Sequence, residues 1–375
     1  MALTFNERPK EHLLYTPEQV ANSTLAALRY QSTLARIVST DAGRDFVPGR
    51  GASVTVRRPV MIDPARVYSA EDRAAEKAIT YSRLFEPYTS VKLGEQIYNA
   101  VKLPDDFATY TLTDMERQVV APMAQSVADA LNKTVADTLT SVPEGLTAVD
   151  TAASGALVTT EGTAFTDQPD GKTAFQQLVE SGEEFLGYGV GLGGAGAHVK
   201  EDQLRANTNR EVLRTIRAAK RLLDARGVAP SNRYLIVGGG WVGAILSQPQ
   251  LNLVDAAGTD GLLRDATLGR LYGFTIVEDY SIDAYSAYAL ESNAITLATR
   301  VPAIPRGVAF GQTASAQGFT LRYLHDYDVD HLQDRAVVDT FAGAQILDPQ
   351  RIVKLTGADG IEEPAAAAVV TDPSA

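Results

Sequence analysis

The chain has 375 residues, enough for two or three compact units with buried cores, and its 45% hydrophobic and 21% charged residues are typical of an ordinary soluble protein. Its 34 Lys and Arg residues against 46 Asp and Glu residues give a net charge of −12, which disfavours a general nucleic-acid binder and a protein that adheres to anionic membranes. Cysteine is absent, which excludes disulfides, thiolate zinc sites and cysteine nucleophiles; a polar start, with no run of about 18 apolar residues, predicts a cytoplasmic protein with no membrane partner.

The first predicted element is a helix that begins at Thr16. Thr16-Pro17-Glu18-Gln19 combines a Thr N-cap, a proline in the first turn and a Gln three residues after the cap, which is the pattern of a capping box. The helix carries a thin apolar stripe made of Val20, Thr24, Leu28, Leu34 and Val38, and Gly43 lies beyond its expected end. A single narrow apolar stripe favours a helix that packs against a separate surface.

A long hairpin is expected next. Residues 51–60, GASVTVRRPV, alternate with period two, and residues 79–93 have the composition of a return strand interrupted at Pro87. Between these legs, residues 63–77 are charged and hold too little apolar material for a core. Because an isolated two-stranded hairpin is marginally stable in water, this arm needs a neighbour to lie on, and another subunit is one candidate.

Residues 112–139 predict one long helix. Apolar residues recur every four positions from Val119 to Leu139, with Ala at many intervening positions, and Thr113 with Glu116 supplies a second capping box. Pro122 is expected to kink this helix and not to end it, because the stripe continues past the proline.

The following region, residues 141–206, is less regular and is expected to be an insertion or a flexible connection with one helix over residues 173–186. Helix returns at residues 208–225, with one apolar and one basic face. The apolar face holds Val212, Leu213, Ile216, Ala219, Leu222 and Leu223, and the basic face holds Arg210, Arg214, Arg217, Lys220, Arg221 and Arg226. A basic face of this kind is either solvated or turned toward an anionic partner.

After Gly227 the pattern is α+β. Strands are expected at residues 234–237, 274–277, 294–298, 319–323 and 336–341, with a short helix at 241–247. The residues from Asp359 onward are acidic and Ala-rich, and we expect them to be frayed.

The stretch YLIVGGGWVGAIL, residues 234–246, satisfies the G-x-G-x-x-G spacing of a dinucleotide-binding turn. Its context differs from that of such a turn, because Pro249 ends the helix after barely two turns. The candidate ribose-binding acid, Asp255, comes early and follows a weak strand. We therefore interpret the motif as a tight strand-to-helix turn, with nucleotide binding as the alternative.

Histidine offers few candidates for a catalytic base. His12 and His198 lie outside any nucleophile context and are expected at the surface. His325 and His331 flank the acidic run Asp326, Asp328 and Asp330, which one strand face would present together. The run lacks the Gly and Glu of an EF-hand loop, which leaves a solvated or subunit-facing acidic strand as the favoured interpretation and cation binding as the alternative. We predict no catalytic residue, no cofactor and no bound metal ion.

The order of these elements is itself informative. An N-terminal arm, the hairpin entered by GASVTVRRP, the helix LTDMERQVVAPMAQSVADALNKTVADTL, the α+β phrases RYLIVGGGWVGAIL and LGRLYGFTIVEDYSI, and the closing LRYLHDYDVDHLQDRAVVDTFAGAQIL follow one another. Together they resemble a tailed-bacteriophage major capsid protein over nearly the whole chain. The resemblance implies an α+β protein of the Johnson or Hong Kong 97-type capsid fold.

The resemblance also divides the chain into expected regions. Residues 1–44 form the N-terminal arm, 45–103 the extended loop, 104–140 the peripheral domain with its spine helix, and 141–206 an insertion or flexible connection. Residues 207–318 form the axial domain with the helix that leads into it, 319–358 the return strands of the peripheral domain, and 359–375 a frayed tail.

The function implied is structural and not enzymatic: identical subunits assemble as hexamers and pentamers into an icosahedral shell around double-stranded DNA, without sequence-specific DNA binding. The implied location is the virion, after assembly in the cytoplasm of the host bacterium. A separate scaffolding protein and a portal are expected partners, and a decoration protein is a further candidate.

Some relatives join their subunits through a Lys and an Asn. Lys77 is the obvious lysine of the loop, but nothing matches its partner or an assisting acid, so we predict no cross-link. A bacterial compartment shell of the same fold and a nucleotide-dependent enzyme remain as alternatives.

Overall fold

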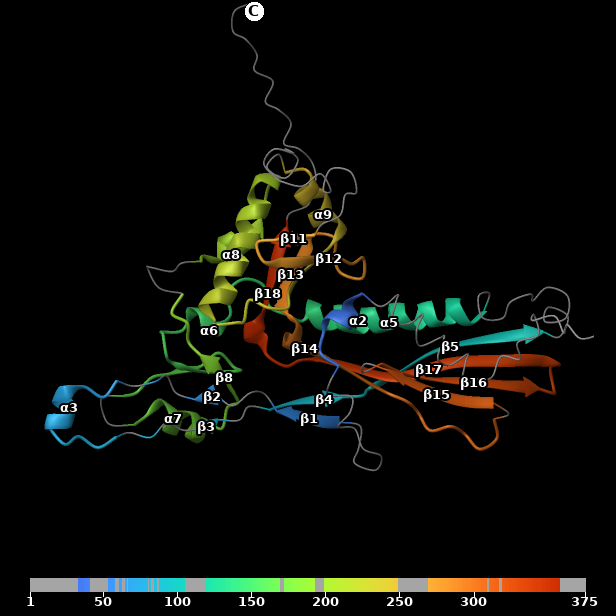
Figure 1. The fold of residues 1–375 in the computed structure, drawn as a ribbon, viewed down its shortest axis with the longest axis horizontal. Coiled ribbons are helices and arrows are strands. Elements are labelled where there is room, and N and C mark those ends of the chain that lie inside the picture. The colour runs from blue at the N-terminus through green and yellow to red at the C-terminus, as the bar shows by residue number, and fades with distance from the viewer. Residues whose placement is uncertain are drawn as a thin grey trace, which may run out of the picture.

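The computed structural model describes residues 33–40, 53–57, 61–62, 65, 67–79, 81, 84–85, 88–104, 119–168, 172–192, 199–248, 269–308, 310–316 and 319–357. The expected helix start at Thr16, the capping box at Thr113 and Glu116, His12, His198, Asp255 and the tail from Asp359 lie outside these residues. The molecule is elongated, with two sheet units, one long helix and a projecting hairpin (Figure 1).

The first unit is a five-stranded antiparallel sheet built around one long strand, β17 (Gln333–Ile346). One edge of β17 pairs with β5 (Glu95–Pro104). The other edge pairs with β16 (Phe319–Asp328) and then with β14 (Ile295–Arg300), while β15 (Phe310–Ala316) pairs with β16.

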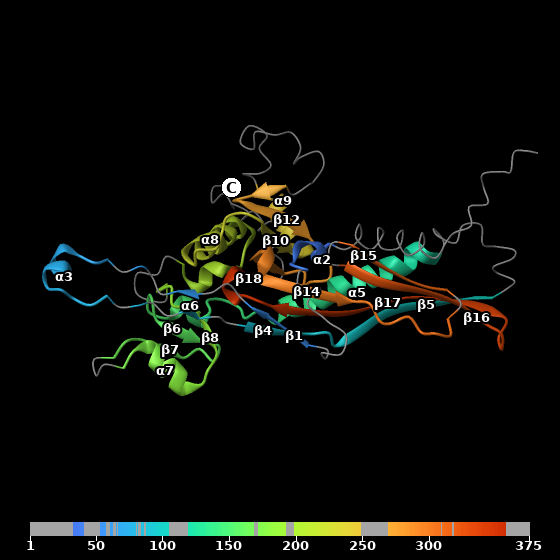
Figure 2. The same cartoon turned by 60° about the horizontal axis from the view of Figure 1, so that its bottom comes forward.

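The long helix α5 (Ala121–Thr140) lies along this sheet (Figures 1 and 2). Met123, Val127, Leu131, Val135 and Leu139 are buried, which confirms the four-residue apolar stripe expected from the sequence. Their core partners in the sheet include Leu321, Ala336 and Val338.

Pro122 lies in the first turn of α5, directly after a π-helical turn at Val119–Val120. Val120, two residues before the proline, keeps helical dihedrals (φ −70°, ψ −42°), so the described residues continue through Pro122 without ending the helix, as the apolar stripe predicted. The first turn tolerates proline because its backbone N–H groups have no partner within the helix.

The second unit is a mixed six-stranded sheet in the order β11-β12-β10-β13-β18-β9. Its strands are β11 (Arg270–Leu271), β12 (Phe274–Glu278), β10 (Arg233–Val237), β13 (Ser286–Glu291), β18 (Ile352–Gly357) and β9 (Arg205–Ala206). The helices α8 (Val212–Ala225) and α9 (Gly239–Leu246) pack on this sheet through one apolar core. The six apolar residues expected on the inner face of α8 are all buried, which confirms that prediction.

The hairpin forms as expected. Strand β1 (Ser53–Arg57) pairs antiparallel with β4 (Tyr88–Lys92), and β2 (Met61–Ile62) pairs with β3 (Leu84–Phe85) farther out. A short helix, α3 (Ala70–Ala74), lies at the tip and has no buried residue. Figure 2 shows α3 far from both sheet units.

Residues 141–192 form a small unit of their own. Strands β7 (Ala164–Phe165), β6 (Leu157–Thr159) and β8 (Phe185–Tyr188) make a three-stranded sheet accompanied by α6 (Ala148–Thr151) and α7 (Ala174–Ser181). The helix expected over residues 173–186 is shorter than predicted, because Gly182 adopts φ +69° and ends α7. The following residues, Phe185 and Leu186, belong to β8.

The remaining elements within the described residues are short. They are α2 (Leu34–Ile37) and four 3-10 turns, η3 (Glu201–Leu204), η4 (Asn209–Glu211), η5 (Ser292–Ala294) and η6 (Pro349–Arg351). Leu34, Ala35 and Ile37 of α2 are buried in the core beside α5.

The chain crosses between the two sheet units more often than the expected regions suggest. β14 and β15 come from residues 207–318 yet lie in the five-stranded sheet, and β18 comes from residues 319–358 yet lies in the six-stranded sheet. β5, the last part of residues 45–103, leaves the hairpin and pairs with β17 over its full length. The sheet to which each strand belongs is set by its pairing partner and cannot be inferred from its position along the chain.

Candidate assembly surfaces

The tip of the hairpin is held by local hydrogen bonds. The Ser69 side chain accepts from the backbone N–H of Asp72 (3.1 Å), and the Asp72 carboxylate accepts in turn from the Ser69 backbone N–H (3.2 Å). The Lys77 ammonium lies 3.1 Å from the same carboxylate. The backbone hydrogen bond from Ser69, together with Lys77, lowers the pKa of Asp72. These hydrogen bonds and the ion pair hold the tip together, although α3 has no buried residue.

Large apolar side chains of the hairpin face solvent. Val67 is 90% exposed, Ile79 69% and Tyr81 87%. Full burial of such a side chain contributes about 1.5–3 kcal/mol, most of which these three side chains do not gain within their own chain. The exposed apolar residues therefore form a surface suited to a partner.

The base of the hairpin, in contrast, is fixed. Val91 and Ala298 are buried there with Val54 and Val56 packed against them. At the corner between β4 and β5 the backbone passes so close to β17 that a Cβ on Gly343 would lie 1.9 Å from the Lys92 carbonyl oxygen. The arm thus leaves the body in a defined direction.

An open groove of about 640 Å³ lies at this base, between α5 and the sheet. Its walls include Lys92 and Glu95 from the hairpin side, Asp137 from α5, Ser141 directly after it, and Gln345 from β17. The lining is polar and mixed in charge, which is typical of a solvated surface groove.

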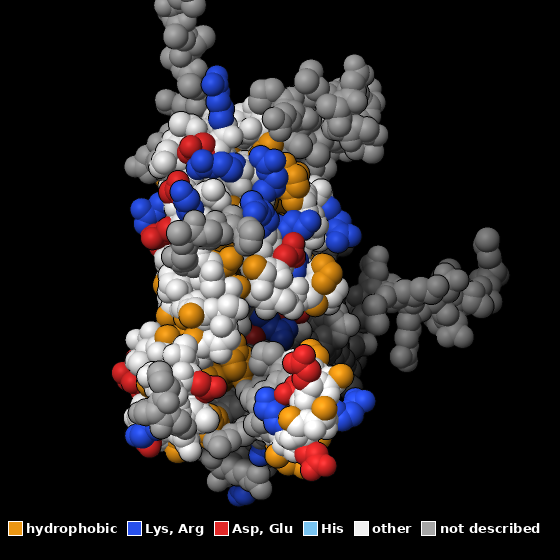
Figure 3. Space-filling view, turned by 90° about the vertical axis from the view of Figure 1, so that its left-hand side faces the viewer, with side chains coloured by type: hydrophobic (Ala, Val, Ile, Leu, Met, Phe, Trp, Pro, Cys, Tyr) orange, Lys and Arg blue, Asp and Glu red, His pale blue; other side chains and the backbone are white. Residues whose placement is uncertain are grey.

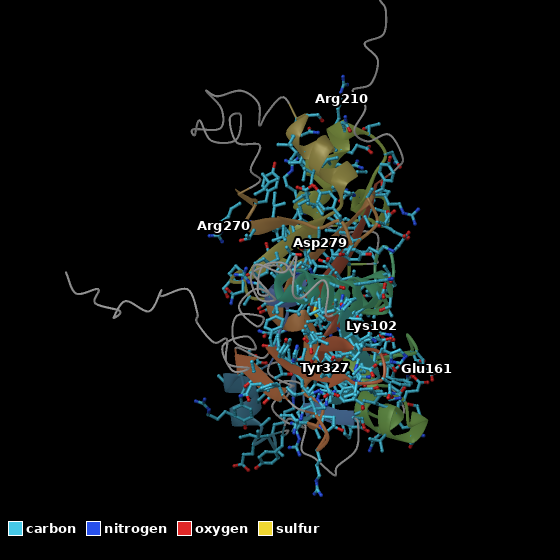
Figure 4. The ribbon with its side chains drawn as sticks, turned by 90° about the vertical axis from the view of Figure 1, so that its right-hand side faces the viewer. Lys102, Glu161, Arg210, Arg270, Asp279 and Tyr327 are labelled. Atoms are coloured by element: carbon cyan, nitrogen blue, oxygen red, sulfur yellow. The ribbon has the colours of Figure 1, made fainter. Side chains whose placement is uncertain are left out.

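The opposite end of the five-stranded sheet carries a second exposed apolar group. Val329 is 74% exposed and Leu332 is 63% exposed in the turn from β16 to β17, and Leu332 adopts φ +47°. Figure 4 places Tyr327 on this side of the molecule. The turn is an exposed apolar tip, and its backbone at Leu332 has a conformation that is uncommon for residues other than glycine.

The acidic run at residues 326–330 differs from the expected continuous strand, because β16 ends at Asp328 and Asp330 lies in the turn. Arg335 lies 3.4 Å from Asp326 and 3.7 Å from Asp328, and the His331 ring lies 3.0 Å from Asp328. The Asp326 and Asp328 carboxylates therefore pair with side chains of the same hairpin. The described residues contain no group of three or more His, Asp or Glu side chains placed to hold a metal ion.

The glycine-rich turn at residues 238–243 is closed by the chain itself. The Gly240 N–H donates to the Ala284 carbonyl (3.0 Å), and a Cβ on Gly238 would lie 2.3 Å from the Asp283 carbonyl. The Trp241 side chain is fully buried and donates to the Tyr285 carbonyl (2.7 Å). The glycines thus allow close backbone packing at the place where a pyrophosphate would sit, which supports the interpretation as a structural turn.

One residue of the expected basic face behaves differently. The Arg226 side chain is 1% exposed and forms a bidentate pair with fully buried Asp150, while its Nη1 donates to the Gln350 (2.9 Å) and Ile352 (3.1 Å) carbonyls. It joins the residue 141–192 unit to the six-stranded sheet. The local sequence does not predict this role, because an arginine at a helix end is usually solvated.

A second buried ion pair was also not predicted. Arg322 and Asp339 face each other in register on β16 and β17, with Nε 2.8 Å from Oδ1, and Gln96 of β5 donates to the same carboxylate (2.6 Å). No local sequence pattern around Arg322 or Asp339 indicates that the two residues form a buried ion pair. The pair fixes the register of three strands.

Sequence comparisons find no relative: no protein-family model and no curated protein matches the chain. Solved structures do match. A chain from Mycobacterium phage Che8 superimposes with a TM-score of 0.54 at 14% identity, covering 86% of this chain and 90% of that one. The capsid structure of the cyanophage P-SCSP1u gives a TM-score of 0.50 at 12% identity, covering 82% and 84%. The chain has the Hong Kong 97-type capsid fold.

This capsid fold confirms the fold class that was expected from the order of the sequence segments. The identities are low, so the likeness concerns the fold. No helix among the described residues is long and apolar enough to cross a membrane.

Proposed function

We propose that the chain is the major capsid protein of a tailed bacteriophage, which self-assembles into an icosahedral shell around double-stranded DNA. The capsid fold and the projecting hairpin with its exposed apolar side chains support this role. The role is structural and needs no catalytic residue, cofactor or metal ion.

In this proposal the five-stranded sheet with α5 is the peripheral domain and the six-stranded sheet is the axial domain around the capsomer centre. The hairpin is the extended loop, and residues 1–44 are the N-terminal arm. Residues 141–192 are an insertion fixed to the axial domain by Arg226 and Asp150.

The observation that carries the proposal is a hairpin with a fixed base and an unburied tip. A second copy of the chain that covers Val67, Ile79 and Tyr81 would bury the apolar surface that the monomer leaves in water. Repetition of this contact around a closed symmetry gives hexamers and pentamers from individually modest interfaces.

The proposed partners beyond identical subunits are a separate scaffolding protein and a portal, with a decoration protein as a further candidate. The DNA is enclosed without sequence-specific binding, and the net charge of −12 suits a container that must release its contents. The proposed location is the virion, after assembly in the host cytoplasm.

Electron microscopy of the expressed full chain, alone and with a co-expressed scaffolding protein, tests the proposal. We expect closed particles of uniform size. A chain that stays monomeric at every concentration in both conditions contradicts a shell function. Nucleic acid inside particles from infected cells supports the phage capsid, and a protein cargo without a genome indicates a compartment shell.

A further inference from the structure

The outer face of α8 carries a stripe of arginines. Arg214, Arg217 and Arg221 recur at helical spacing, and Arg210 lies four residues before Arg214 in the turn η4 that leads into the helix. Lys220 flanks the stripe. Figure 3 shows Lys and Arg side chains gathered on the upper part of the molecule, over α8. We call these five residues the α8 basic face.

The α8 basic face is poorly neutralised within the described residues. Arg214 reaches Glu211 at 3.4 Å, yet its Nε is buried without a hydrogen-bond partner, and Arg217 lies over the Tyr272 ring at 5.9 Å. Arg210, Lys220 and Arg221 form no ion pair with any described residue. Like charges four residues apart on a helix repel one another, so the face favours an anionic occupant.

The described chain ends near the N-terminal end of α8. Gly357, the last residue of β18, pairs with Ala206 of β9, and its N–H donates to the Tyr285 carbonyl (2.7 Å). Ala206 leads within a few residues into η4 and α8. Figure 4 places Arg210 at the top of the molecule, at the N-terminal end of α8. Residues 358–375 therefore start at the end of α8 where the basic face begins.

The charge and the length of residues 358–375 both match this face. Asp359, Glu362, Glu363 and Asp372 are their only charged residues. An extended chain of this length reaches about 60 Å, whereas a helix of the length of α8 is about 21 Å long. Tethering also raises the effective concentration of the acidic residues at the face to about the millimolar range.

We propose that residues 358–375 dock on the α8 basic face of their own chain and shield it from other polyanions. Two observations favour this occupant over nucleic acid. The tail is already attached near the end of α8 at which the basic face begins, and the net charge of −12 repels a free polyanion from the chain as a whole. The inference concerns the single subunit and does not depend on shell formation.

Zero-length carbodiimide cross-linking of the full chain, at concentrations where it is monomeric, tests the contact. Lys220 is the only lysine of the face, so we expect an amide bond between its amine and the carboxylate of Glu362 or Glu363, identified by mass spectrometry. We expect at least about a fivefold loss of this product in 1 M salt, because the contact is electrostatic. Lys172, which is 54% exposed on another unit, is the control amine.

Substitutions complete the test. The triple variant Arg214→Gln, Arg217→Gln, Arg221→Gln is expected to lower the Lys220 product about fivefold while leaving the Lys172 products unchanged. Equal linkage to Lys220 and Lys172, or a yield that the triple variant does not change, overturns the proposal. Mixing isotopically light and heavy chains separates linkage within one chain from linkage between chains, and products found only between chains also overturn it.

Binding of a short DNA duplex tests the shielding. The full chain with Asp359→Asn, Glu362→Gln and Glu363→Gln is expected to bind the duplex about tenfold more tightly than the unsubstituted chain, with a stronger dependence on salt. Equal affinity of the two proteins shows that the tail does not cover the face and contradicts the proposal.

Discussion

At the scale of single residues, buried ion pairs tie together segments that are far apart in the sequence. Arg226 and Asp150 join α8 to the residue 141–192 unit, and Arg322 and Asp339 join neighbouring strands of the five-stranded sheet. Each pair is accompanied by hydrogen bonds that satisfy its remaining polar atoms. A buried charge is tolerated only with such partners, so the loss of one member is costly.

Arg226→Ala is expected to lower the free energy of unfolding by about 3–5 kcal/mol, because it leaves the Asp150 carboxylate buried without its cation. Arg226→Lys is expected to recover only part of this loss, since an ammonium cannot make the bidentate contact. Urea unfolding of the unassembled chain measures the effect. Arg306→Ala, at an exposed position, is the control, and an equal effect of the two Ala variants would show that the buried pair does not stabilise the fold.

At the scale of elements, close backbone approaches determine how the strands and turns meet. The carbonyls of residues 283–284 contact the turn between β10 and α9, and the Lys92 carbonyl contacts β17. Both contacts require glycine for lack of space, because neither Gly238 nor Gly343 adopts a positive φ. Close backbone packing thus explains why residues 238–243 have the G-x-G-x-x-G spacing of a dinucleotide-binding turn.

Gly238→Ala is expected to destabilise the chain by about 1–3 kcal/mol, the usual cost of overpacking, because the new Cβ would lie 2.3 Å from the Asp283 carbonyl oxygen. The neighbouring Gly239→Ala has no atom within 4 Å of its Cβ and is expected to be neutral or to stabilise the helix by up to about 1 kcal/mol. Thermal and urea unfolding of both variants measure the difference. Equal stability of the two variants would contradict the packing explanation.

At the scale of the whole molecule, two sheet units and α5 form the body, and the hairpin projects from it with its tip in solvent (Figure 1). The body has large cores, whereas α3 has no buried residue. Stability and assembly are therefore separable. Changes at the tip should alter association and leave the folding of the subunit intact.

The double variant Ile79→Asp, Tyr81→Asp is expected to fold like the unsubstituted chain and to fail to form particles. Each buried apolar side chain contributes about 1.5–3 kcal/mol at an interface, so each contact should weaken at least about tenfold. Unfolding midpoints and electron microscopy measure the two properties. Val179→Asp, at a position 62% exposed on α7, is the matched control, and normal particles from the hairpin variant would exclude this surface from the subunit contacts.

The local elements can be predicted from the amino-acid sequence, and their order predicts the fold class. The hairpin, the stripe of α5 and the two faces of α8 follow from periodicities of two and 3.6 residues, which are properties of short segments. Only the tertiary structure showed that β5 and β14 join β17, that β18 joins the other sheet, and that Arg226 and Arg322 are buried. Strand partners and ion-pair partners lie far apart along the chain, and no local pattern records which distant backbone or carboxylate will meet them.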